Sequence, residues 1–226
     1  MRACRPRIVF TFLLASASLV VSAGAQTDAS PTVEERKLES VHPGVISGDI
    51  YRNSFFGFSL EIPPGWKLAD SAALRMLQER NKKLLLQQPK LGRYSRNGEV
   101  DFPLLVMIER EPDKTGQRHR LVRIQCTDVS ERPGQPAADD YLKFVAEMSP
   151  RGDPSMDYSS TLEPATLGGR QFWKIHFTQK SSILWHGEHF AAIDNKHVLQ
   201  IILTSPDEAG LLGMEAILRT LHFDTP

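Results

Sequence analysis

Four histidines in the C-terminal part of the chain have the residue type and spacing that could support chemistry: His176, His186, His189 and His197. Side chains alternate between the two faces of a strand, so His186 and Glu188 share one face and His189 points to the other. A His-x-Glu pair could supply two metal ligands, and His176 could add a third from a neighbouring strand. The simpler interpretation is a set of half-exposed polar residues near a sheet end. Because the register between the strands is not readable, the sequence leaves open whether these residues form a site.

Other catalytic patterns are weak or missing in the sequence. Cys126 lies in an alternating apolar stretch typical of a buried strand, which favours a structural role over a catalytic thiol. There is no Gly-x-Ser-x-Gly motif, and Ser181 and Ser182 fall in a predicted hairpin turn. No Walker A or Gly-x-Gly-x-x-Gly motif occurs, and Gly168 and Gly169 fit a turn before a strand. The sequence therefore assigns no catalytic, cofactor-binding or metal-binding residue, although a carboxylate pair for glycoside hydrolysis stays open.

The elements that must position these residues start at the motif Phe-Gly-Phe-Ser-Leu-Glu-Ile-Pro-Pro-Gly-Trp, over residues 56–66. Its apolar residues at alternate positions share one face of a strand, and the two prolines end that strand. Three tryptophans, Trp66, Trp173 and Trp185, are expected in the core, with Trp66 mostly buried.

Helical periodicity predicts three helices, over residues 71–87, 137–148 and 207–220. Apolar runs predict strands over residues 103–108, 121–128, 171–178, 183–193 and 197–204, with Asp194-Asn195 as a tight hairpin turn. Strands and helices alternate irregularly, with hairpins rather than repeated βαβ units. This order predicts an α+β fold: a largely antiparallel β-sheet flanked by helices, as an α/β/α sandwich.

The N-terminal 25 residues match a secretory signal peptide, with three arginines, an apolar run over residues 8–21 and the small-residue sequence Ala23-Gly-Ala25. The apolar run has about fourteen residues, fewer than the roughly twenty that span a bilayer, so we expect no transmembrane anchor after cleavage. Residues 26–48 are expected to be an exposed segment before a single domain over residues 49–226. We therefore expect an exported protein, either periplasmic or extracellular.

Three segments together resemble the PsbP-like superfamily: residues 56–66, the Gly-Gly-Arg-Gln-Phe-Trp segment over residues 168–173, and Leu-Arg-Thr-Leu-His-Phe over residues 218–223. This superfamily includes the photosystem II extrinsic subunit, bacterial DcrB-like exported proteins and a Ran-binding nuclear import factor. The resemblance covers about residues 49–223 and implies a PsbP-like domain. Its members mostly act as accessory or binding proteins, and no motif transfers a catalytic residue or a cofactor.

The sequence thus predicts an exported, non-enzymatic binding or accessory protein of the cell envelope, whose partner is an unknown envelope protein or small ligand. A hydrolase or metal-dependent enzyme with a site among the C-terminal strands is the alternative, and a structural surface protein without a discrete site is a third possibility. The 27 basic and 27 acidic residues balance, which argues against a nucleic-acid partner.

Overall fold

A computed structural model of the protein describes residues 41–87, 101–109, 119–130 and 137–224. The predicted signal peptide (residues 1–25) and most of the predicted exposed segment (residues 26–48) lie outside these ranges, so both stay predictions. Within the described ranges, no helix combines the length and the apolar character needed to cross a membrane.

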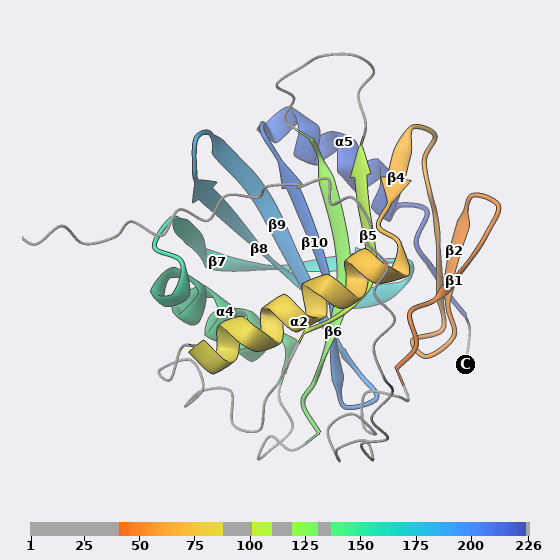
Figure 1. Cartoon of the computed structure of the whole chain (residues 1–226), viewed down its shortest axis with the longest axis horizontal. Helices are drawn as coiled ribbons and strands as arrows, with labels where there is room; N and C mark the ends of the chain where they lie inside the picture. The colour runs from red at the N-terminus through yellow and green to blue at the C-terminus, as the bar shows by residue number, and fades with distance from the viewer. Residues whose placement is uncertain (1–40, 88–100, 110–118, 131–136, 225–226) are drawn as a thin grey trace, which may run out of the picture.

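A seven-stranded sheet forms the centre of the protein (Figure 1), and every neighbouring pair of its strands is antiparallel. Its spatial order is β4-β5-β6-β10-β9-β8-β7. In the β9–β10 hairpin, Asn195 and Lys196 adopt positive φ, so the turn lies one residue beyond the predicted Asp194-Asn195. The strands span Trp66–Leu68 (β4), Phe102–Glu109 (β5), Leu121–Asp128 (β6), Met156–Leu167 (β7), Arg170–Lys180 (β8), Leu184–Asp194 (β9) and His197–Ser205 (β10).

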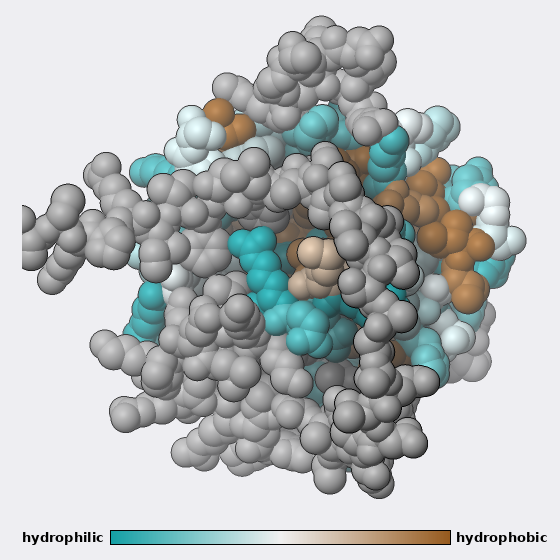
Figure 2. Space-filling view, viewed as in Figure 1, coloured by the Kyte–Doolittle hydropathy of each residue, from teal (hydrophilic) through white to brown (hydrophobic). Residues whose placement is uncertain are grey.

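A smaller four-stranded sheet, in the order β1-β2-β3-β11, is also antiparallel. β1 is an edge strand, and Figure 2 shows hydrophobic residues gathered on this side of the molecule, where Val45 and Ile46 are exposed. The sequence predicts neither the separate sheet nor β11, which is only two residues long. The strands span Val45–Ser47 (β1), Ile50–Asn53 (β2), Phe58–Glu61 (β3) and His222–Phe223 (β11).

Within the described residues, three helices cover the large sheet, and Figure 1 shows α2 and α4 in front of it and α5 behind it. They span Ser71–Gln87 (α2), Ala138–Gly152 (α4) and Glu208–Leu218 (α5). α2 packs on β5, α4 on β7, β8 and β9, and α5 on β9, β10 and β3. We call the face under α2 and α4 the front face of the large sheet, and the face under α5 and the small sheet the rear face. The predicted α+β fold with helices on both sides of an antiparallel sheet is confirmed.

The predicted helix ends are wrong in two places. The sequence predicts an end at residue 148, but α4 continues through Pro150 to Gly152. Pro150 lies in the last turn, where its missing N–H costs the helix only the bond to the carbonyl of residue 146. The Asp153 N–H still donates to the Ser149 carbonyl. α5 ends at Leu218, two residues earlier than predicted, and begins after Asp207, whose side chain accepts a hydrogen bond of 2.6 Å from the Gly210 N–H.

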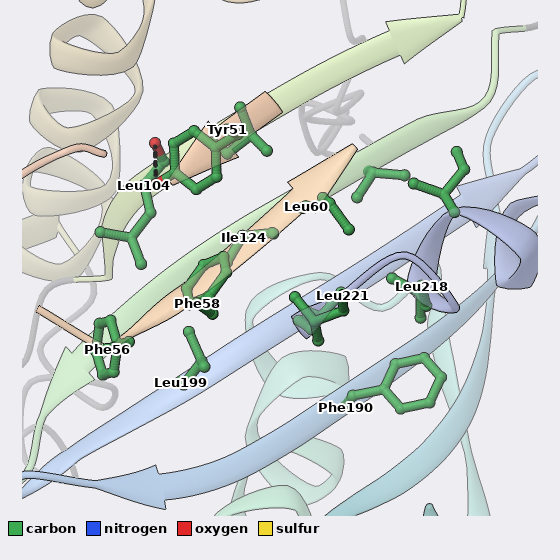
Figure 3. Packing of buried hydrophobic residues seen from close by; sticks show 14 of the residues in the cluster. Tyr51, Phe56, Phe58, Leu60, Leu104, Ile124, Phe190, Leu199, Leu218 and Leu221 are labelled. Carbon is green, nitrogen blue, oxygen red and sulfur yellow. Dashed lines mark hydrogen bonds between the residues drawn. The ribbon is translucent and has the colours of Figure 1, made fainter. Parts of the chain in front are cut away.

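The main hydrophobic core fills the space between the rear face, the small sheet and α5 (Figure 3). Tyr51 is a buried link between the two sheets, because its hydroxyl donates to the Leu104 carbonyl at 3.3 Å and accepts from the Gly44 N–H at 3.1 Å. Val41 is also buried in this core. Residues 45–47 form β1 of the small sheet, while residues 42, 43 and 45–48 are exposed.

The tryptophans are less buried than the sequence predicts. Trp66 is only partly buried against the main core, because β4 is an edge strand with a neighbour on one side. Trp173 is 37% exposed, which contradicts its predicted place in the core. It shares the front face with Ile175, but the cluster under α4 includes Ile175 and not Trp173. Trp185 is partly buried.

Polar residues are buried on the front face in a closed hydrogen-bond network around Gln200. The Gln200 side-chain oxygen accepts from Gln125 at 3.0 Å and from the His189 Nε2 at 2.9 Å. Its side-chain nitrogen donates to the Thr127 hydroxyl at 2.7 Å and to Asp101 at 3.1 Å. Because Gln200 uses its oxygen as acceptor, His189 must carry its proton on Nε2, which leaves the buried Nδ1 as an acceptor without a partner. His189 is therefore held as a neutral ring.

The hydroxyl of Tyr51 is expected to stabilise the fold measurably. Tyr51→Phe keeps the ring and leaves the Gly44 N–H and the Leu104 carbonyl without this partner. We expect the free energy of unfolding in urea to fall by about 1–3 kcal/mol. The slope of this free energy against urea concentration should stay unchanged, since unfolding exposes nearly the same surface area in both proteins. A Tyr51→Phe variant as stable as the parent would show that the hydroxyl does not link the two sheets.

His189 is expected to make the protein lose stability in mild acid. Burial lowers the pKa of His189 to about 4, below the value of about 6.5 in an unfolded chain. The unfolded state therefore binds this proton first, so stability is intact above pH 6.5 and falls as the pH drops from 6.5 towards 4. The loss from this residue reaches about 3 kcal/mol at pH 4.

The matched variant is His189→Gln, which keeps a side-chain N–H donor and removes the titration. Urea denaturation of both proteins between pH 7 and pH 4 measures the difference, so other titrating groups cancel. We expect the parent to lose stability relative to His189→Gln as the pH falls. Parallel curves for the two proteins would contradict a buried neutral His189.

Candidate functional site

A cleft of about 500 Å³ opens on the rear face, between the strands β7, β8 and β9 and the helix α5. α5 starts directly after β10 and packs over β9 and β10, so it leaves part of β7 and β8 uncovered on this side. The cleft is lined by apolar and polar side chains, with Leu211 and Leu212 from α5 opposite polar residues of the strands. Leu212 is 67% exposed and lies at the opening.

The register of β8 and β9, which cannot be read from the sequence, brings His176 and Glu188 together. His176 pairs directly with Glu188 across the two strands, and His176 Nδ1 lies 3.6 Å from Glu188 Oε1. His186 is on the same face, 3.7 Å from the Glu208 carboxylate of α5. All of these residues line the cleft. His189 does not join them, because it belongs to the network on the front face.

Glu188 is the most deeply buried charged group of the cleft, with a residue exposure of 3%. Lys174 Nζ lies 3.2 Å from its Oε1 and 3.5 Å from Glu163 Oε2. Burial by itself would lower the pKa of Lys174, but the charges of Glu188 and Glu163 outweigh it, so the pKa of Lys174 is raised. Lys174 is therefore a permanent cation that compensates a buried carboxylate.

Only one oxygen of Glu188 is engaged in this way. Its Oε2 is buried and has no hydrogen-bond partner. A buried acceptor without a partner lowers stability by about 1–3 kcal/mol compared with a satisfied one. Glu188 thus lines the cleft with one carboxylate oxygen buried and unpartnered.

The sequence does not identify Lys174, Glu163 and Glu208 as neighbours of this site. Lys174 and His176 are two residues apart on β8, and therefore on one face, which is a signal that the sequence contains. Glu163 opposes Lys174 in the β7–β8 register, and Glu208 approaches through the packing of α5. Neither of these placements can be read from spacing, because both depend on tertiary register.

The residues that the structure describes contain no group of three or more His, Cys, Asp or Glu side chains with the arrangement of a metal site. Burial raises the pKa of Cys126, which is fully buried as predicted, so its thiol stays protonated. Ser181 lies in the β8–β9 turn as predicted, where its hydroxyl donates to the Ile183 carbonyl at 3.3 Å. Gly168 and Gly169 form the β7–β8 turn with positive φ, also as predicted.

Within the described ranges, no histidine is hydrogen-bonded to a serine, threonine or cysteine side chain. The histidines of the cleft contact carboxylates instead. A nucleophile activated by a neighbouring base requires the first kind of contact.

No protein-family model matches the chain, and no curated protein sequence matches it. Solved structures do resemble it. The solution structure of cyanobacterial PsbP (CyanoP) from Synechocystis sp. PCC 6803 is 10% identical, with a TM-score of 0.46 over 80% of this chain and 98% of that chain. LpqN, involved in cell envelope biogenesis of Mycobacterium tuberculosis, is 16% identical, with a TM-score of 0.42 over 74% of this chain and 83% of that chain.

PA94 of Pseudomonas aeruginosa, a protein of unknown function, is 16% identical, with a TM-score of 0.40 over 54% of this chain and 83% of that chain. A solved PsbP structure is thus among the similar ones. The likeness concerns the fold alone. Because each of these TM-scores is below 0.5, we draw nothing from them about ligand, partner or activity.

Proposed function

We propose that the protein is an exported, non-enzymatic binding protein of the cell envelope, and that the cleft beside α5 is its binding site. The single observation that carries this proposal is Glu188, a charged side chain that is 3% exposed and keeps one oxygen without a partner at the floor of a cleft of about 500 Å³. A group that only stabilises the fold is normally satisfied by the protein itself. A volume of several hundred Å³ is in the range of small-ligand pockets.

The assignment as a binding protein rests on how the polar groups of the cleft are used. Lys174 and His176 both contact the same Glu188 oxygen, and the charge of Lys174 neutralises this buried carboxylate. A hydrolase with a carboxylate pair would need both Glu163 and Glu188 free to take up or release a proton. Glu163 is exposed, but Glu188 is buried and held by Lys174. These contacts favour binding over turnover.

Export is supported by the sequence, through the basic start, the apolar run over residues 8–21 and Ala23-Gly-Ala25. We expect the mature protein to begin at Gln26 and to be found outside the cytoplasm. N-terminal sequencing of the protein purified from fractionated cells measures this directly. A native protein that retained Met1, or that fractionated with the cytoplasm, would contradict export.

The position of the binding site can be tested by photo-crosslinking in intact cells. A photoreactive amino acid replaces Leu212 at the opening of the cleft, and in a second strain it replaces Met76 on α2. Both side chains are strongly exposed, at 67% and 73%, so neither substitution should disturb the fold. We expect a discrete crosslinked product from position 212 and none of the same mass from position 76.

Two outcomes would count against the proposed function. The same products from both positions, or none from position 212, would mean that the cleft is not where the protein binds. A reproducible hydrolase activity of the purified protein that disappeared in Glu188→Gln would establish the enzyme alternative.

A further inference from the structure

We propose that the cleft binds a primary ammonium group carried on an aliphatic chain, as in a lysine side chain or an alkylamine. This inference rests on the proposed function and specifies the ligand chemistry of the same site. Its starting point is the unpartnered Oε2 of Glu188 at the cleft floor. A carboxylate oxygen can only accept hydrogen bonds, so the group that completes it must be a donor.

The charges around the cleft select a cation as that donor. Asp157, Glu188 and Glu208 line the cleft, and Glu163 lies beside it in contact with His176. Among the described residues that line the cleft or contact its carboxylates, Lys174 is the one permanent cation. Carboxylates therefore outnumber ammonium groups, which attracts a positively charged ligand and disfavours an anion.

The position of Lys174 leaves room for a second cation. It approaches Glu188 at Oε1 and continues to Glu163, while its ammonium also lies 6.0 Å from the centre of the Phe190 ring. Oε2 of the same carboxylate is not used by Lys174. A ligand ammonium at Oε2 would therefore add a charge-assisted hydrogen bond without displacing an existing partner.

The opposite wall explains why the cation should be carried on an aliphatic chain. Leu211 and Leu212 of α5 line the cleft, and Leu212 is 67% exposed at its opening. A long amine can lay its methylene groups along apolar surface while its charged end reaches a polar group. A compact metal cation lacks such a stem, and the described residues do not provide three metal ligands in one place.

Isothermal titration calorimetry at physiological ionic strength tests the proposal with four probes. Acetyl-Ala-Lys-Ala-amide and its norleucine analogue differ by the ammonium group alone. Cadaverine and pentane-1,5-diol provide a neutral comparison for a small amine, since two hydroxyl groups replace its two ammonium groups. We expect the two ammonium probes to bind more tightly than their neutral partners by about tenfold or more, as for a hydrogen bond to a charged group.

Binding by the peptide but not by cadaverine would assign the site to a side chain of a protein partner. Binding by cadaverine as well would assign it to free amines. Either result supports the ammonium site. No binding by either ammonium probe at millimolar concentration, or equal binding by the neutral probes, would overturn the proposal.

Three variants locate the interaction. Glu188→Gln removes the charge of the proposed acceptor, and we expect the affinity for the ammonium probes to fall about tenfold or more. Leu212→Arg places a positive charge at the opening, and we expect a comparable fall. Met76→Arg adds the same charge at an equally exposed position on α2, outside the cleft, and should leave the affinity unchanged.

If Glu188→Gln does not fold, Leu212→Arg still tests the proposal. Leu212 is exposed, so this substitution leaves the core unchanged and the variant should fold. Equal losses in Leu212→Arg and Met76→Arg would show a non-specific charge effect and overturn the proposal. A crosslinked partner at position 212 together with no ammonium binding would refute this ligand class and leave the proposed function standing.

Discussion

The structure depends on the burial of β9 and β10 from both sides. On the front face α4 packs on β9, and the cluster under it includes Val198 of β10. On the rear face α5 and the small sheet cover both strands. β10 is buried along almost its whole length, and so is the middle of β9. Since a buried polar group needs a partner, every polar side chain of these two strands must find one within the protein or remain unsatisfied. This constraint determines which polar residues are structural and which are available to a ligand.

Adjacent residues of β9 lie on opposite faces, and each keeps one buried atom without a partner. His189 faces front and is kept neutral by burial, with its Nε2 proton donated to Gln200. Gln200 in turn makes four hydrogen bonds and leaves none for an outside molecule. Glu188 faces the rear, stays paired with Lys174 through one oxygen, and has its other oxygen free. The structural role of His189 and the binding role proposed for Glu188 thus follow from the alternation of a strand between two differently covered faces.

The sequence predicted what depends on local pattern and failed where the outcome depends on register. The α+β class, the strands around Cys126 and Trp173, and the separation of His189 from Glu188 all follow from alternation. The His176–Glu188 pairing could not be read from spacing, because a shift of one residue in the β8–β9 register would move every contact to the other face. The exposure of Trp173 depends on how far α4 extends over the front face. The small sheet depends on the pairing of β3 with β11, which is distant in the sequence. Both are tertiary outcomes that composition does not encode.

The location of the cleft follows from the backbone rather than from the residues that line it. Asp207 caps α5 and follows β10 directly, so the helix must begin beside Ser205 and cross back over its own strand and β9. Its 11 residues span only about 16 Å, and the small sheet covers the region around Phe172 and Phe223 instead. The rear side of β7 and β8 next to His176 is therefore left uncovered between α5 and the small sheet. This gap does not depend on the side chains that line it. A cleft placed by topology can accept different side chains at low cost to the fold, whereas the network around Gln200 cannot. Changes at positions 176, 186 and 208 should therefore alter what the cleft binds, and changes at positions 125, 189 and 200 should alter stability.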